Sequence, residues 1–191
     1  MTTIIGIGGT LSPHSRNLAA LEHALQSATA AGAQTELYSV FDLQLPMLDP
    51  HKVWEDYGPT VHQLVEAMRR ADGLIISTAA YHGTMAGVTK NALDYAEFLS
   101  GGPTPYWHNK VVGLIATASG TMAGPNTLTG LTHVVHALRG VVVPLMVAIP
   151  DADNAIDREG HVTDNHWANR LAQLGHLVVT MAQQLNSVQA L

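Results

Sequence analysis

The chain has no cysteine in its 191 residues. This absence excludes disulfides, iron–sulfur clusters, thiolate metal sites and a cysteine nucleophile. Basic residues are also few, with 9 Lys and Arg against 15 Asp and Glu and a net charge of −6. An acidic chain without a basic run argues against nucleic acid as a partner.

The sequence also lacks a long apolar run. No segment approaches the roughly 20 apolar residues that span a bilayer, so we expect no membrane partner. Met1 is followed at once by a strand pattern, which leaves no room for a signal peptide, and we expect a cytoplasmic protein. The 11 histidines show no metal-ligand spacing, and His133 and His136 lack a third ligand, so we expect no metal site.

Five apolar segments alternate with helix-like segments along the chain. Strands are predicted at residues 2–8, 34–40, 73–79, 110–117 and 141–149, and helices at residues 18–25, 61–71, 88–99, 126–138 and 162–185. This alternation predicts an α/β fold, a doubly wound five-stranded parallel sheet with helices on both faces. No repeat or linker divides the chain, so we expect a single domain over residues 1–191. Pro144 in the fifth strand predicts an edge position or a bulge, and Thr163 or Asp164 is expected to cap the last helix.

The first predicted strand leads into a loop rich in hydroxyl groups, residues 9–17, and then into a helix. The first N–H groups of a helix lack partners and carry partial positive charge, so this geometry suits a phosphate. Thr10, Ser12 and Ser15 add neutral donors, and Arg16 adds a cation. The loop is neither a Walker loop nor a dinucleotide fingerprint, and its position favours a flavodoxin-type mononucleotide site. The alternative is an ordinary connection in which Ser15 only caps the helix.

Two further loops are expected at the same end of the sheet, residues 80–87 and 118–125, because ligands of such sheets lie beyond the carboxyl ends of the strands. Residues 81–84 (Tyr-His-Gly-Thr) offer an aromatic ring and a flexible backbone to a flat heterocycle. Residues 119–121 (Ser-Gly-Thr) offer amides and hydroxyls to a ring that gains negative charge on reduction. Each loop alone is compatible with ordinary turn chemistry, but the three together indicate a ligand.

These motifs resemble those of the NADPH-dependent FMN reductase family, flavodoxin-like proteins that include flavin, quinone, azo and chromate reductases. The family's first loop reads Gly-Ser-x-Arg-x-x-Ser-x-Asn and is similar to residues 9–17, with Ser12 in place of the usual Arg. Its second motif reads Pro-x-Tyr-[Asn/His]-Gly-Ser-x-x-Gly-x-x-Lys-Asn-x-x-Asp and is similar to residues 79–94, with Ala79 in place of Pro. The resemblance covers residues 3–185.

The resemblance implies a flavodoxin-like fold and an FMN-dependent oxidoreductase. Hydride would pass from NADPH or NADH to FMN and then to an acceptor such as free flavin or a quinone, with no catalytic side chain required. Arg16 is expected beside the flavin phosphate or the 2′-phosphate of NADPH. The implied cofactor-binding residues are Thr10, Ser12, Ser15 and Asn17 for the phosphate end, and Tyr81, His82, Gly83, Thr84, Ser119, Gly120 and Thr121 for the ring. Arg16 is a further cofactor-binding candidate that comes from the loop itself and not from the family's motif.

The family also implies small-molecule substrates and a homodimer or homotetramer, with the helix that carries Lys90 and Asp94 in the contact. It leaves open whether FMN stays bound or is released reduced to a flavin-dependent monooxygenase. Two other readings of the sequence stay open: a flavodoxin-like electron carrier that does not use NAD(P)H, and a flavin-free binding protein that keeps only the sheet.

Overall fold

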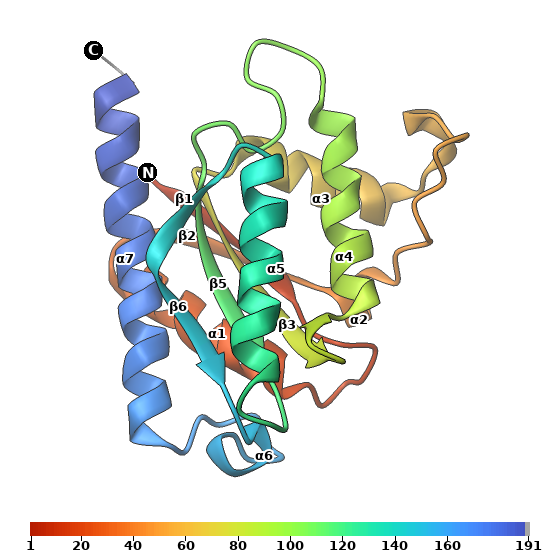
Figure 1. The fold of residues 1–191 in the computed structure, drawn as a ribbon. Coiled ribbons are helices and arrows are strands. Elements are labelled where there is room, and N and C mark those ends of the chain that lie inside the picture. The colour runs from red at the N-terminus through yellow and green to blue at the C-terminus, as the bar shows by residue number, and fades with distance from the viewer. Residues whose placement is uncertain (190–191) are drawn as a thin grey trace.

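A computed structural model describes residues 1–189. Its core is a sheet of parallel strands in the order β2-β1-β3-β5-β6 (Figure 1). The strands are β1 (Thr3–Gly8), β2 (Gln34–Ser39), β3 (Gly73–Tyr81), β5 (Val111–Thr117) and β6 (Val141–Ile149). The predicted five-stranded, doubly wound parallel sheet is therefore confirmed. A sixth strand, β4 (Thr84–Met85), pairs antiparallel with the end of β3 and was not predicted, because two residues carry no periodic pattern.

Helices cover both faces of the sheet, as predicted (Figure 1). One face packs against α1 (Arg16–Ala30) and α7 (Asn165–Gln189). The other packs against α3 (Pro59–Arg70), α4 (Gly87–Asp94), η2 (Tyr95–Leu99) and α5 (Ala123–Ala137). Short helical turns, α2 (Val40–Leu43), η1 (Trp54–Asp56) and α6 (Ala152–Ala155), lie in the connections. No helix within residues 1–189 is long and apolar enough to cross a bilayer.

Alternate residues of the central strands face opposite helix layers. In β1, Ile4 packs into the layer of α1 and α7, whereas Ile5 and Ile7 pack into the layer of α3, α4 and α5. The two helices of the first layer approach closely at Gly175 of α7. A side chain there would place its Cβ 2.1 Å from the carbonyl oxygen of Ala24, so only glycine allows this contact.

Pro144 lies where the sequence predicts, on an edge strand and at a bulge. β6 is the last strand of the sheet. Val142 pairs with Val112 and Met146 pairs with Leu114, so the register shifts between these pairs. Residues 143–145 of β6 lie opposite the single residue Gly113 of β5. Pro144, which has no N–H to donate, therefore lies where the regular hydrogen bonding between the two strands is interrupted.

Several helix boundaries differ from the predicted ones. The predicted helix 88–99 is α4 followed by the 3₁₀ segment η2, and the predicted loop after β2 contains α2 and η1. The last helix starts at Asn165 rather than at residue 162, because Asp164 is its cap: the Oδ1 atom accepts a hydrogen bond from His166 N at 2.7 Å. Val162 instead bridges to Ile156 in an isolated antiparallel pair.

Candidate functional site

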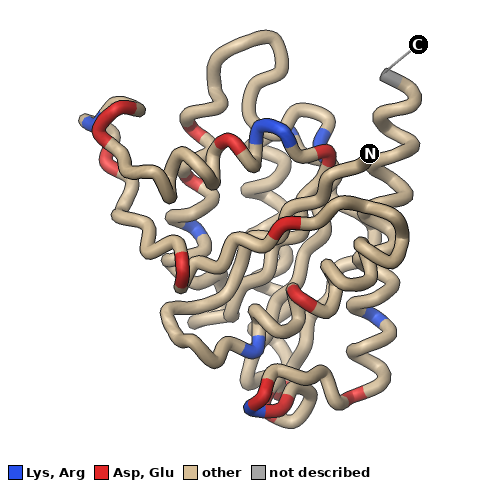
Figure 2. Tube along the Cα trace, turned by 180° about the vertical axis from the view of Figure 1, so that it is seen from behind, with Lys and Arg blue, Asp and Glu red and all other residues tan. Residues whose placement is uncertain are grey.

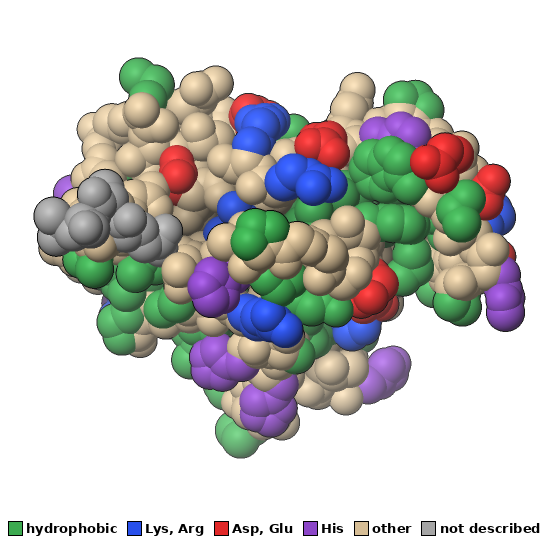
Figure 3. All heavy atoms as spheres, turned by 90° about the horizontal axis from the view of Figure 1, so that it is seen from above, with side chains coloured by type: hydrophobic (Ala, Val, Ile, Leu, Met, Phe, Trp, Pro, Cys, Tyr) green, Lys and Arg blue, Asp and Glu red, His purple; other side chains and the backbone are tan. Residues whose placement is uncertain are grey.

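The three loops that the sequence places at one end of the sheet do meet there. They border a cleft of about 260 Å³ at the carboxyl ends of β1, β3 and β5, and residues of α6 complete its wall. Figure 1 shows α6 at this end of the sheet. The opposite end of the sheet, seen in Figure 3, carries basic side chains. Lys110 immediately precedes β5 at that end, and its Nζ atom donates to the carbonyl of Arg69 at 2.9 Å.

Seven of the predicted cofactor-binding residues line the cleft: Thr10, Ser12, Ser15, Arg16, Asn17, Tyr81 and Ser119. The other five, His82, Gly83, Thr84, Gly120 and Thr121, follow directly in the chain but do not line it. Seven lining residues were not predicted as ligands: His14, Ala79, Ala80, Thr117, Ala118, Ala152 and Asp153. The last two follow the fifth strand, and the parallel topology alone was a signal that this loop also reaches the site.

The hydroxyl groups of the first loop organise its backbone. Thr10 Oγ1 accepts from Ser12 N at 3.2 Å, Ser12 Oγ accepts from His14 N at 3.4 Å, and Ser15 Oγ accepts from Leu18 N at 3.4 Å as the cap of α1. The last two bonds are long and therefore weak. A hydroxyl that accepts a hydrogen bond keeps its own proton to donate, so all three can still serve an anionic ligand.

Asn17 fixes the loop from inside the protein. The buried side chain accepts from Gly9 N at 2.7 Å and donates to Gly9 O at 3.2 Å. The backbone carbonyl of Asn17 accepts from Ser77 Oγ at 2.7 Å. The side chain therefore braces the loop, and the group of Asn17 free to meet a ligand is its N–H in the first turn of α1, which has no partner within the helix.

A tight hairpin carries the aromatic motif. His82 and Gly83 form its turn with positive φ values of 52° and 80°, the sign that type I′ turns require at both positions. Thr78 anchors the hairpin, because its buried hydroxyl lies 2.9 Å from the Thr89 hydroxyl and accepts from Ala86 N at 3.1 Å. Tyr81, 55% exposed at the end of β3, is thus presented at the cleft by a firmly held backbone.

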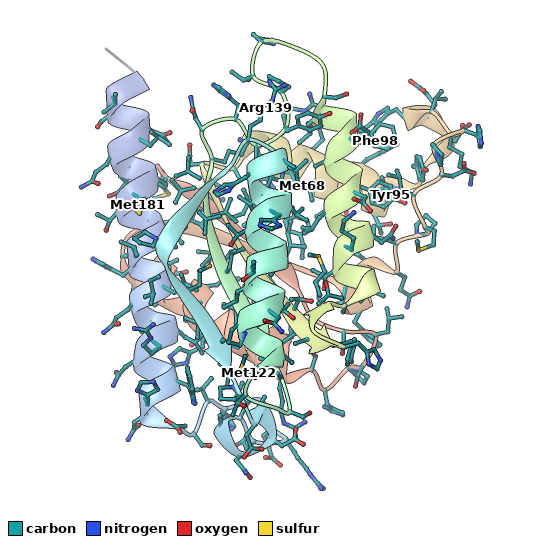
Figure 4. The ribbon with its side chains drawn as sticks, viewed as in Figure 1. Met68, Tyr95, Phe98, Met122, Arg139 and Met181 are labelled. Carbon is teal, nitrogen blue, oxygen red and sulfur yellow. The ribbon has the colours of Figure 1, made fainter. Side chains whose placement is uncertain are left out.

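The remaining part of the second motif has a structural role. Asn91 holds the proline-rich loop after β2, because it accepts from Leu48 N at 2.9 Å and donates to Pro46 O at 2.8 Å. Tyr95 donates to the same carbonyl at 2.9 Å. Burial raises the pKa of Tyr95 to about 12, so this hydroxyl remains a donor at neutral pH. Figure 4 shows Tyr95 and Phe98 away from Met122, which lies at the end of the molecule that carries α6.

Arg16 closes the cleft against the segment after β6. Its NH1 atom lies 2.9 Å from Asp153 Oδ1, and its Nε atom donates to Ile156 O at 3.1 Å. On the far side of Arg16 lies a larger cavity of about 450 Å³, bounded by the start of α1 and residues 157–160. That cavity does not include the loops after β3 and β5. Within residues 1–189 no three His, Asp or Glu side chains gather as metal ligands.

Residues 2–154 match the sequence profile of the NADPH-dependent FMN reductases. The chain belongs to this family. It is 30% identical to an NAD(P)H-dependent FMN reductase of Pseudomonas aeruginosa over 170 residues, which are 85% of each chain. It is 29% identical to an FMN-dependent NADPH-azoreductase of Staphylococcus aureus over 134 residues, 66% of this chain and 65% of that one. The fold is similar to that of FerB, a flavoenzyme NAD(P)H:acceptor oxidoreductase of Paracoccus denitrificans, with a TM-score of 0.75, 20% identity and coverage of 96% and 98%.

Family membership makes the protein an enzyme, an oxidoreductase that uses FMN and NAD(P)H. The electron-carrier and flavin-free readings of the sequence are therefore set aside. The cleft offers donors that suit a phosphate, three hydroxyls and the N-terminus of the 15-residue helix α1, and Tyr81 and Ser119 line the same cleft.

Proposed function

We propose that this cleft binds FMN and that the enzyme reduces small planar acceptors with electrons from NAD(P)H. In this proposal, Thr10, Ser12, Ser15 and the first N–H groups of α1 hold the phosphate. The hairpin of residues 81–84 and the loop of residues 119–121 flank the ring. The observation that carries the proposal is the meeting of these three loops in one cleft at the carboxyl end of the sheet.

Bound FMN supplies hydride acceptance and two-electron transfer to an acceptor. The protein supplies position and hydrogen bonds. The anchored hairpin keeps Tyr81 at the cleft, and the hydroxyl and N–H groups of residues 119–121 offer donors toward the edge of a heterocycle. We assign no side chain as acid, base or nucleophile, because the flavin supplies the electron-transfer chemistry and the protein supplies only position and hydrogen bonds.

Exposed apolar side chains at this end of the sheet support an acceptor that is flat and apolar. Leu11, Tyr81 and Met122 are 65%, 55% and 68% exposed, and each belongs to one of the three loops. Figure 4 places Met122 at the end of the molecule where α6 lies. Exposed thioether and aromatic groups adapt well to planar partners, so we propose free flavins, quinones and azo compounds as the acceptor class.

Steady-state kinetics tests this proposal with FMN, FAD, a quinone and an azo dye. We expect Met122→Ala to lower kcat/KM for the quinone about fivefold, since covering part of a methionine is worth about 1 kcal/mol. Met146→Ala is the matched control, because Met146 is 37% exposed on the edge strand β6. Turnover of free FMN alone, with no other acceptor used, would instead favour release of reduced flavin to a flavin-dependent monooxygenase.

We further propose weak discrimination between NADPH and NADH. Ser12 stands where family members usually carry an Arg, and Arg16 is engaged by Asp153 and Ile156, so few cations face the cleft. The extra phosphate of NADPH needs such cations. We expect KM values for the two donors within about tenfold of each other, and a preference of 100-fold or more would contradict this expectation.

The assembly and location of the enzyme are also part of the proposal. We propose a cytoplasmic homodimer or homotetramer, because NAD(P)H is supplied in the cytoplasm and the helix α4 presents an exposed Lys90–Asp94 pair. An isolated pair of this kind stabilises its own helix by only a few tenths of a kcal/mol, so it does not by itself hold subunits together. Light scattering at micromolar concentration should give a mass of at least twice 20.3 kDa, and a single 20.3 kDa species would rule the oligomer out.

A further inference from the structure

The cleft proposed for the FMN phosphate contains one cation and one anion, and they are already paired. Arg16 and Asp153 both line it, with 2.9 Å between NH1 and Oδ1. The other lining side chains are neutral apart from the titratable His14. A phosphate dianion therefore meets a cleft whose fixed charges cancel, although the helix N-terminus favours it.

Asp153 belongs to a segment that holds Arg16 from two directions. The second bond runs from Arg16 Nε to the carbonyl of Ile156, 140 residues further along the chain. Acidic and basic residues gather at this end of the molecule, as Figure 2 shows. The Arg16 side chain is 32% exposed, whereas that of Asp153 is 71% exposed. The carboxylate can thus be altered without disturbing a packed core.

An incoming phosphate and Asp153 compete for the same guanidinium. Arginine binds carboxylate and phosphate through the same planar set of N–H donors, so a donor engaged by Asp153 is not available to the phosphate. The carboxylate also lies on the wall of the same cleft, and two anions in one cleft repel each other. Both effects weaken the binding of a flavin that carries a phosphate and leave an unphosphorylated flavin unaffected.

This inference rests on the proposed function: we propose that Asp153 sets the affinity for FMN by restraining Arg16 and by repelling the phosphate group. The wild-type protein then binds FMN less tightly than the same cleft would without this carboxylate, and FMN exchanges with solution. Asp153 thus acts partly through Arg16, as a positioning residue, and partly through its own charge on the cleft wall.

Flavin fluorescence titrations of the apoprotein test the proposal, with FMN and riboflavin as the two probes. We expect Asp153→Asn to lower the Kd for FMN at least about fivefold at low ionic strength, since it frees a charge-assisted bond at a partly exposed site. The gain should shrink at 0.5 M salt, where screening is strong. The Kd for riboflavin should not change.

Two further variants separate the pair from general charge effects. Asp151→Asn makes the same charge change two residues away, at a left-handed φ of 48° that Asn tolerates, and should leave FMN binding within twofold of wild type. In an Arg16→Met background, Asp153→Asn should change log Kd for FMN by less than half of the change that it causes in the wild-type background.

Equal gains for FMN and riboflavin, or an unchanged FMN affinity in Asp153→Asn, would overturn the inference alone. Failure of the wild-type protein to bind FMN at all would overturn the proposed function and this inference with it.

Discussion

At the scale of single residues, the first loop divides its work between side chains that face the cleft and one that faces inward. Thr10 and Ser15 keep protons to donate, because each hydroxyl only accepts from a backbone N–H in the structure. Replacing both by Ala removes two donors to a dianion, and we expect the affinity for FMN to fall at least about tenfold. Fluorescence titration measures this change. Riboflavin, which has no phosphate, is the control ligand, and equal losses for both flavins would remove these hydroxyls from the phosphate site.

Asn17 has the inward role. Its amide makes both hydrogen bonds to Gly9, and both atoms are buried. Asn17→Ala leaves the N–H and C=O of Gly9 without these partners, so we expect a loss of about 1–3 kcal/mol in the free energy of unfolding. Urea denaturation of the apoprotein measures it. A variant as stable as wild type would mean that water replaces the amide and that the loop does not depend on it.

Local pattern was sufficient to find the hydroxyls of the first loop and the Tyr-His-Gly-Thr motif, but not the hairpin that carries this motif or the surroundings of Arg16. The hydroxyl loop is recognisable because strand, loop and helix follow each other within a short stretch. Asp153 comes after the last strand, and only the folded sheet brings it to Arg16. Similarly, the sequence pattern could not distinguish an Asn17 that contacts a ligand from one that braces Gly9, because both roles use the same side chain at the same position.

At the scale of elements, the β3–β4 hairpin is a small addition on which the site depends. Gly83 has a φ of 80°, so Gly83→Ala places a Cβ in a conformation that costs about 1 kcal/mol or more. We expect a corresponding loss of stability in urea denaturation. Gly120→Ala is the matched control, because nothing lies within 4 Å of its added Cβ and its φ is not left-handed. Equal stabilities of the two variants would contradict this account of the hairpin.

A second element-scale contact joins β2 to the end of α3. Arg70 NH1 donates to Glu36 Oε1 at 2.6 Å, and Tyr38 donates to the same carboxylate at 2.8 Å. The Arg70 guanidinium is the main cause that lowers the pKa of Glu36 below its ordinary value. A carboxylate with a lowered pKa stabilises the fold above its ordinary pKa, and this contribution is lost as the pH falls through the lowered value.

We therefore expect Glu36→Gln to lower the stability at pH 7 by about 1 kcal/mol or less, because the pair is partly exposed. The difference from wild type should narrow at pH 3 and below. Thermal unfolding across this range measures it. Glu55→Gln, at an exposed carboxylate without an ion pair in residues 1–189, is the control. A difference that stays constant with pH would show that the ion pair is not its source.

The sequence predicted the elements whose patterns are long. The five parallel strands and the main helices were found because apolar runs and helical periods persist over several residues. The 3₁₀ segment η2 was read as a continuation of α4, because both follow one apolar pattern. The short turns α2, η1 and α6 have at most four residues each and were missed for the same reason as β4.

At the scale of the whole molecule, the parallel sheet explains why one end carries the site. All five main strands run in the same direction, so every loop that follows a strand emerges at the end where the cleft lies. The first loop supplies hydroxyls, the hairpin after β3 supplies Tyr81, and the loop after β5 supplies Ser119. The segment after β6 adds Asp153, whose negative charge offsets the positive charge of Arg16 in the cleft.

The central claim is that this cleft holds an FMN that NAD(P)H reduces. Anaerobic stopped-flow mixing of the FMN-loaded protein with NADPH, and separately with NADH, tests it directly. We expect the visible absorbance of the oxidised flavin to bleach with both donors. The Thr10→Ala/Ser15→Ala protein at the same FMN concentration should show a smaller bleached fraction. If neither donor bleaches the bound flavin, the account is wrong.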